Sequence, residues 1–329
     1  MKDNLGGEGR GPFKERGSSH RSGFSVGGVS VHLASTDIEG VALVPSLEPF
    51  RAETAASDID IRITWADSLC PPSGPQLFDS GSLWRVYEDR TGLQFDFTAP
   101  ILGKQPYKRL IVDGRFRRAR LQMNAECFAG TGYAVAPLEY PLDELLIMHR
   151  LTQEKAIELH GVGIVGPDGA SNLFIGYSGA GKSTTARLWT AHHNVRVLSD
   201  DRIIVREHRV RDENVRDDEL CEDELRKDAT EIFMYGTPWH GEACFALPDR
   251  ALLQRIFILE HGCGNVITRL SRSQTVAELF ARSFVPFHRH EYVDSALRFL
   301  ERVADSVACY RYAFEPDESA VDRILNFHD

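Results

Sequence analysis

Residues 174–189, FIGYSGAGKSTTARLW, constrain the fold of this chain more strongly than any other stretch. They contain the pattern G-x-x-x-x-G-K-[ST], whose glycines allow backbone N–H groups to surround phosphate oxygens. An apolar run, NLFI, leads into the pattern, and residues that favour a helix follow it. The sequence therefore predicts a buried strand, a phosphate-binding loop and a helix in succession.

Each position of this pattern has an expected task in nucleotide binding. Lys182 is expected to neutralise the β and γ phosphates of ATP, and the Ser183 hydroxyl to ligate Mg²⁺. Motors, switches and kinases share the pattern, so it predicts a bound nucleotide without a reaction. The expected cofactor-binding residues are Gly176, Ser178, Gly179, Ala180, Gly181, Lys182, Ser183 and Thr184.

Two successive acids, Asp200 and Asp201, end the apolar run VRVLS. In nucleotide-binding proteins of this type the neighbouring strand end lies beside the Mg²⁺ site. One acid can therefore hold the metal while the other accepts a proton from an attacking hydroxyl. The alternative is one metal ligand and one aspartate that caps a turn.

Two further features near these motifs have both a catalytic and a structural interpretation. His160 lies in the apolar run ELHGVGIV, where a histidine is either a core residue or an active-site group. Residues 236–242, GTPWHGE, combine a Gly-Pro bend with His240 and Glu242, which suits a loop that contacts a ligand.

Composition narrows the range of partners and compartments. The net charge of -10 disfavours nucleic acid and anionic membranes, because both need a basic surface on the protein. No apolar run approaches the roughly 20 residues that span a bilayer, and the N-terminus lacks the apolar core of a signal peptide. The six cysteines are scattered, which favours free thiols in a reducing cytoplasm.

Pattern changes along the chain predict three parts. Residues 1–23 are rich in Gly, Ser and mixed charge and are expected to form a flexible tail, and residues 24–140 alternate like the strands of a β-rich domain. Residues 141–329 predict an α/β domain that begins with a helix over PLDELLIMHRLTQEK, with Leu142, Leu145, Leu146 and Met148 on one face. The acidic stretch 211–230 is interpreted as a solvated loop or, alternatively, a mobile flap.

These residues, taken in order, resemble the HPr kinase/phosphorylase family. The resemblance is carried by LHGVGIV, GYSGAGKST, LSDDRIIV, MYGTPWHGE, RIFILEHG and ARSFVPF, and it covers about residues 141–327. The longer run is more similar to HPr-kinase-like proteins without an assigned substrate than to HPr kinase itself.

The resemblance implies a core related to that of phosphoenolpyruvate carboxykinase, and ATP- and Mg²⁺-dependent phosphorylation of a serine hydroxyl. By position it implies Asp200 as general base and Asp201 as metal ligand, with the two roles exchangeable, and His160 as an active-site group near both. HPr kinases are hexameric, so a homo-oligomer is also implied.

Two departures separate the chain from the bifunctional enzymes of that family. Thr184 stands where they have an acid that bears on metal handling and on the reverse reaction. Their RGLGIINV-type segment is missing, and GTPWHGE lies in the corresponding region. The resemblance therefore implies neither phosphorylase activity nor HPr as the substrate.

The resulting hypothesis is a cytoplasmic kinase that uses ATP and Mg²⁺ and phosphorylates a protein, a peptide or a small molecule. Lys182 serves catalysis as well as binding, and His240 or Arg202 is expected to stabilise the transferring group. Two alternatives remain: a carboxykinase-like phosphotransferase, and a non-catalytic nucleotide-binding or ATPase switch module.

Overall fold

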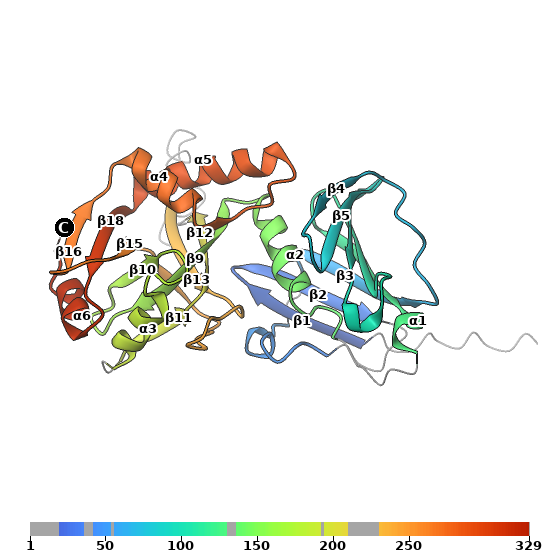
Figure 1. Ribbon diagram of the computed structural model, residues 1–329, viewed down its shortest axis with the longest axis horizontal. Helices are drawn as coiled ribbons and strands as arrows, with labels where there is room; N and C mark the ends of the chain where they lie inside the picture. The colour runs from blue at the N-terminus through green and yellow to red at the C-terminus, as the bar shows by residue number, and fades with distance from the viewer. Residues whose placement is uncertain are drawn as a thin grey trace, which may run out of the picture.

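The computed structural model describes residues 20–35, 42–53, 56–129, 136–191, 194–209 and 230–328. These residues form a mixed α/β structure with two large β-sheets. Figure 1 shows the two sheets side by side, with helix α2 (Leu142–Leu151) between them.

The first sheet has eight strands and comes entirely from the N-terminal part of the chain. Side chains alternate between its faces, and β2 reads buried and half-buried in strict alternation. Strands β2, β3 and β8 run parallel, and the other pairings are antiparallel. The strand order is β1 (His20–Val26), β2 (Val29–Ser35), β3 (Ile59–Ala66), β8 (Arg118–Asn124), β7 (Lys108–Asp113), β6 (Gly92–Phe97), β5 (Trp84–Glu88) and β4 (Gln76–Asp79).

Three short helices accompany the first sheet: η1 (Glu48–Phe50), η2 (Pro100–Leu102) and α1 (Ala125–Phe128).

The second sheet has ten strands, and only the pairs β10–β15 and β15–β18 are parallel among the described strands. Its main order is β14 (Arg250–Leu252), β13 (Thr230–Gly236), β12 (Arg202–Arg209), β9 (Ala156–Val165), β10 (Ser171–Ile175), β15 (Arg255–His261), β18 (Ala308–Phe314) and β16 (Val266–Arg269). Strands β11 (Arg196–Ser199) and β17 (Ser283–Phe284) also pair with β9.

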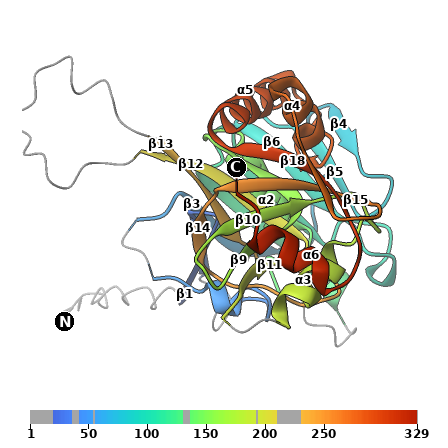
Figure 2. The ribbon, with the colours of Figure 1, turned by 90° about the vertical axis from the view of Figure 1, so that its left-hand side faces the viewer.

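Helices cover both faces of the second sheet (Figures 1 and 2). Helices α4 (Arg272–Phe280) and α5 (His290–Ser306) pack on one face through a buried apolar cluster. Helices α3 (Lys182–Thr190) and α6 (Glu318–Leu325) pack on the other face through a separate cluster. This explains why β9 and β10 have nearly continuous apolar sequences, because both of their faces are covered.

Helix α2 differs from the helix expected from the sequence. Every residue of α2 except Met148 is buried, including Asp143, Glu144 and His149. The apolar face that the spacing predicts therefore includes the one residue that is not buried. The physical reason is the position of the helix, because α2 belongs to the core cluster that joins the first sheet to Ile204 of the second.

The tip of the hairpin between β1 and β2 also joins the two sheets. A Cβ atom on Gly27 would lie 2.5 Å from Cδ1 of Ile204, so the backbone packs directly against β12. Arg206 of the same strand donates a hydrogen bond of 3.0 Å from Nη1 to the Gly27 carbonyl oxygen. Glycine is required here both by this close approach and by its φ of 59°.

The structure changes one predicted boundary and leaves others open. Strand β1 begins at His20, inside the segment 1–23 that the sequence predicts to be a tail. Residues 1–19 and the acidic residues 210–229 lie outside the described residues, so the expectations for them stay predictions. The predicted division near residue 140 falls between the last strand of the first sheet and the first strand of the second.

Two expectations from composition can be compared with the described residues. Within the described ranges, no helix is both long enough and apolar enough to cross a membrane. The five cysteines in those ranges are free thiols, as the scattered spacing predicts: Cys70, Cys127, Cys244, Cys263 and Cys309.

Candidate active site

The segment with the phosphate-binding pattern forms a tight turn between β10 and α3. Gly179 and Gly181 have φ angles of 82° and 98°, in the left-handed region that favours glycine. A Cβ atom on Gly181 would lie 2.4 Å from Cζ of Phe314. No side chain caps α3, so its first N–H groups are open at the end of a helix that attracts anions.

The other predicted loop residues surround this turn. Ser178 and Gly179 are exposed at its tip, whereas Ala180, Ser183 and Thr184 are half-buried and Gly176 is buried. A Cβ atom on Gly176 would lie 2.6 Å from Cβ of Ala180, which shows how closely the loop folds on itself. The loop therefore presents backbone and the side chains of Tyr177 and Ser178 to the outside.

Lys182 lies across its own loop. Its Nζ donates hydrogen bonds of 3.0 Å to the carbonyl oxygens of Gly176 and Tyr177, and the side chain is nearly buried. Burial lowers the pKa of Lys182, the charge of Asp201 opposes this, and the charges of Arg202 and Arg282 add to the lowering. Lys182 therefore lies within the electrostatic reach of an acid and two arginines.

The central strand β9 brings the loop and the acidic pair together. Ile175, the last residue before the loop, pairs with Gly161 on one side of β9. Arg202, the first residue after the two aspartates, pairs with His160 on the other side. Because neighbouring strands lie about 4.8 Å apart, the loop and the acids emerge roughly 10 Å from each other, with His160 between them.

His160 and Asp201 form a close pair at this point. His160 Nε2 lies 2.9 Å from Asp201 Oδ1, and the two side chains are 23% and 26% exposed. Burial opposes ionisation of Asp201, but the hydrogen bond from His160 and the positive charges of Arg202 and Lys182 outweigh it and lower the pKa of this carboxyl. The interpretation of His160 as a core residue does not fit this partly open position beside an ionised acid.

Asp200 is placed differently from the predicted general base. Its carboxylate accepts backbone N–H bonds from Gly241 (3.0 Å), Ala243 (2.8 Å) and Phe245 (3.1 Å), and the residue is 1% exposed. A substrate hydroxyl has no access to oxygens that are buried and already engaged. This geometry matches the alternative in which one aspartate of the pair holds a turn.

Arg202 is surrounded by acids instead of pointing freely toward a phosphate. Its Nε lies 2.9 Å from Glu144 Oε1 and 3.5 Å from Glu158 Oε1, and Nη1 pairs with Asp201. The guanidinium also stacks on Phe284, with the ring centroid 4.0 Å from Cζ. A phosphate would have to compete with these partners for Arg202. The contacts therefore fit better with a role in which Arg202 holds Asp201 in position.

The acids around Arg202 extend into helix α2. Burial raises the pKa of Glu158 well above its ordinary value, and the neighbouring carboxyl of Glu144 adds to this. Burial also raises the pKa of Asp143 to about 6, although Asp143 accepts a 2.9 Å hydrogen bond from Trp239 Nε1. A buried polar network therefore connects the helix between the two sheets with the His160–Asp201 pair.

The segment 236–242 is held on one side by buried contacts and is exposed to solvent on the other. Trp239 is held by Asp143, and Gly241 lies so close to Asp200 that a Cβ atom would come within 2.9 Å of Oδ2. His240 and Glu242 are exposed, and His240 Nδ1 contacts the Gly241 carbonyl oxygen at 3.0 Å. Both predicted contact residues are thus accessible to a ligand at the rim.

Arg282 is a candidate site residue that the sequence reasoning missed. Its guanidinium stacks on Tyr177 of the loop, with 4.0 Å between Cζ and the ring centroid, and the residue is 8% exposed. Nη1 pairs with Glu278, while Nε has no hydrogen-bond partner among the described residues. Arg282 lies in ARSFVPF, one of the segments that carry the resemblance, but nothing in the residues around it indicates a role for this arginine.

A predicted metal site can be compared with the donors present. The described residues contain no group of three or more His, Cys, Asp or Glu side chains that could hold a metal ion. Mg²⁺ ordinarily takes one or two carboxylates and completes its shell with phosphate oxygens and water. Ser183 beside Lys182, and Asp201 within electrostatic reach of Lys182, match that donor set.

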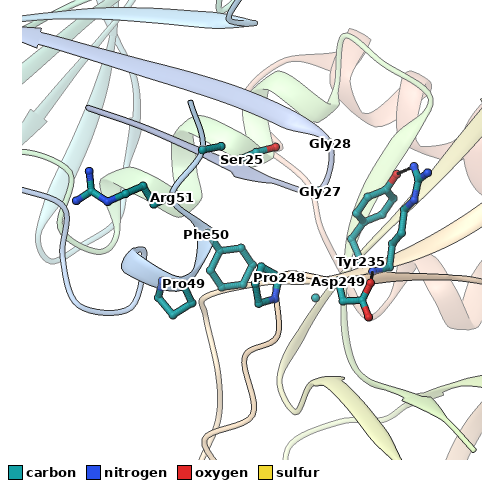
Figure 3. A pocket seen from close by; sticks show the side chains of 12 residues that line it. Ser25, Gly27, Gly28, Pro49, Phe50, Arg51, Tyr235, Pro248 and Asp249 are labelled. Atoms are coloured by element: carbon teal, nitrogen blue, oxygen red, sulfur yellow. Dashed lines mark hydrogen bonds between the residues drawn. The ribbon is translucent and has the colours of Figure 1, made fainter. Parts of the chain in front are cut away.

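A separate cavity of about 500 Å³ lies between the β1–β2 hairpin and strands β13 and β14 (Figure 3). Of the charged side chains at its rim, Arg51 pairs with Glu48 and Asp249 with Arg196, while Arg250 donates a 3.1 Å hydrogen bond to the Tyr235 hydroxyl. Gly236, where the segment 236–242 begins, is part of its lining, whereas the loop 176–184 is not. The cavity is therefore distinct from the site around His160.

Comparison with known proteins adds no assignment: no family model and no curated protein matches this chain.

Proposed function

We propose that this protein transfers the γ-phosphoryl group of ATP to a hydroxyl group, in the first place the serine hydroxyl of a protein or peptide. The observation that carries the proposal is the register of β9, in which His160 lies between the glycine-rich loop and its partner Asp201 at the acidic strand end. A proton acceptor that lies between a phosphate-binding loop and a metal-holding acid, themselves about 10 Å apart, suits an in-line transfer between two bound groups.

The phosphate end of the site is assigned to the loop and its helix. The open N–H groups at the start of α3 and the ammonium group of Lys182 bind the β and γ phosphates. Ser183 and Asp201 are the residues that would hold Mg²⁺, which supplies charge neutralisation on the phosphates when bound. Lys182 moves from its own carbonyl oxygens to the phosphates when ATP enters.

The proton acceptor is assigned to His160 in place of Asp200. When Nε2 carries the hydrogen donated to Asp201, Nδ1 retains a lone pair, and Nδ1 has no hydrogen bond to the described residues. The hydroxyl oxygen forms its bond to the γ phosphorus as its proton passes to Nδ1. The bond from phosphorus to the β–γ bridging oxygen breaks, and ADP leaves.

The arginines are assigned different tasks. Arg282 lies beside the loop, and its charge acts on Lys182, so it is placed to neutralise the transferring group. Arg202 holds Asp201 in place from the side of Glu144. His240 and Glu242 at the open rim contact the acceptor.

A second candidate function, ATP hydrolysis in a switch module, is favoured by the buried state of Asp200. With Asp200 engaged by a turn, one accessible acid and one histidine remain, which suffices to hold metal and to position water. The aspartate pair therefore does not distinguish a kinase from a switch.

The experiment that tests both candidates uses γ-labelled ATP, Mg²⁺ and serine-containing acceptors with the wild type and the variants Lys182→Ala and His160→Ala. Label on a serine that disappears in both variants supports the kinase. Free phosphate alone, lost in both variants, supports the switch. His290→Ala, an exposed histidine at the start of α5, is the matched control and is expected to retain full turnover. Neither product above background, or equal turnover in Lys182→Ala, overturns both.

A further inference from the structure

On strands β1, β2 and β3 and the first half of β8, the first sheet has a face whose side chains are exposed or half-buried among the described residues. Its buried side chains, such as Leu33 and Ile61, point toward α2 and the second sheet. Because successive side chains of a strand point to opposite faces, the residues between them point away from that core. Four exposed arginines lie on this outer face: Arg21, Arg62, Arg118 and Arg120.

The strand register places these arginines in rows. Arg21 pairs with Ala34, Ala34 pairs with Arg62, and Arg62 pairs with Arg120, so the row crosses β1, β2, β3 and β8. Arg118 stands two residues before Arg120 on the same face. Three strand spacings give the row a length of about 14 Å.

Like charges directly opposite each other weaken a sheet, yet Arg62 faces Arg120 across two neighbouring strands. No ion pair joins any of the four arginines to another of the described residues. Asp89 acts on Arg120 through its charge without pairing with it. In a chain with a net charge of -10, such an arrangement indicates an anion that completes the surface.

The face is also hollowed beside the row. A groove of about 550 Å³ is lined by Arg21, Arg62 and Arg118, together with His32 and Asp60. Asp60 accepts a hydrogen bond from Ser57 and lies 3.9 Å from His32 Nδ1. The groove is therefore basic along one side and contains one carboxylate.

We propose that this face docks an acidic segment of a partner polypeptide, which lies in extended form along the arginine row. A row of about 14 Å matches four to five extended residues, each of which adds about 3.3 Å. A nucleic acid fits less well, because its phosphate backbone extends beyond the row of about 14 Å over a chain whose net charge is -10. The surface and its partner are independent of the phosphoryl transfer proposed above.

The test measures binding of a fluorescently labelled hexaglutamate peptide to the full chain by anisotropy at low ionic strength. Arg62→Ala/Arg120→Ala is expected to weaken binding by about tenfold, the effect of two exposed ion pairs. Arg62→Lys/Arg120→Lys keeps the charges and is expected to retain most of the binding, which separates charge from folding.

The control is Arg272→Ala/Arg298→Ala, which removes two exposed arginines from the helices of the second sheet. It is expected to bind the peptide like the wild type. Equal loss in this control, or no loss in Arg62→Ala/Arg120→Ala, overturns the proposal. Tighter binding of a twelve-residue oligothymidylate through the same arginines also overturns it, because the partner would then be a nucleic acid.

Discussion

The two sheets differ in how their faces are covered. The second sheet is covered by α4 and α5 on one face and by α3 and α6 on the other, so its polar residues meet at strand ends and loops. The first sheet buries one face, and on β3 and β8 charged residues stand exposed on the other face in the middle of the strands. A sheet covered on both faces leaves its strand ends and loops for a reactive site, whereas a sheet with an exposed face can bind a partner on that face.

The largest expected effect tests whether chemistry belongs to the second sheet. We expect His160→Gln to lower ATP turnover by about 10²- to 10⁴-fold, because a general base is removed from a site that keeps its phosphate loop. The thermal unfolding temperature should change little, since this side chain is partly exposed. Steady-state turnover and a melting curve decide this. If His160→Gln kept its ATP turnover while Arg62→Ala/Arg120→Ala lost it, the reactive site would belong to the first sheet and not to the second.

A smaller effect distinguishes the two adjacent aspartates of the second sheet. We expect Asp200→Asn to lower the free energy of unfolding by about 2 kcal/mol, because the new amide cannot accept all three backbone N–H bonds. Asp201→Asn should lower turnover with a smaller loss of stability. Urea unfolding of both variants provides the measurement. An Asp200→Asn variant as stable as the wild type would contradict the structural role.

Two histidines at the junction between the sheets are expected to destabilise the fold in acid, whereas Asp143, whose pKa burial raises to about 6, acts in the opposite direction. Burial lowers the pKa of His149 in α2 to about 3 and that of His288 to about 4. The unfolded chain binds protons at these groups below about pH 6.5, whereas the folded chain does not. Stability is therefore fully present above pH 6.5 and is lost as the pH falls toward 3, by up to about 1.4 kcal/mol per pH unit for each group.

The variant His149→Phe isolates this effect. A phenyl ring fits beside Phe116, on which the imidazole stacks with 5.1 Å between ring centroids. The loss of unfolding free energy between pH 6.5 and pH 4.5 should be smaller in the variant than in the wild type, as measured by denaturant unfolding at each pH. An identical pH dependence would mean that His149 does not set it.

The smallest expected effect concerns the open face of the first sheet without a ligand. Removing one arginine of the facing pair, in Arg62→Ala, should raise the free energy of unfolding by a few tenths of a kcal/mol at low salt. The gain should vanish at high salt, because screening removes the repulsion. Paired melting curves at two salt concentrations measure it. A loss of stability at both concentrations would show that the arginines are satisfied within the chain.

Elements with strong periodicity could be predicted from the sequence, and so could the order strand, loop and helix around residues 174–189. Strands β9, β10, β11, β12, β13 and β15 of the second sheet also lie where apolar runs indicate them, whereas β14, β16, β17 and β18 were not predicted. Their mostly antiparallel pairing could not be predicted, because a buried strand has the same apolar pattern in either direction.

The details of the site depended on contacts that a sequence does not contain. Asp200 and Asp201 have the same side chain and adjacent positions, yet the amides of residues 241–245 engage Asp200 alone. Arg282 lies against Tyr177, about a hundred residues earlier in the chain, so no local pattern announces it. Helix α2 contains buried charges because two sheets enclose it, and composition alone predicts an amphipathic helix.

The central position of strand β9 limits where the length of this chain can change during evolution. This strand pairs with β10, β11, β12 and β17, so one inserted residue within it would turn His160 to the opposite face and shift every neighbour. The twenty residues between Arg209 and Thr230 connect two strands whose register is set by direct pairing, so additions there leave that register intact. Insertions and deletions should therefore accumulate in such connections, while β9 keeps its length.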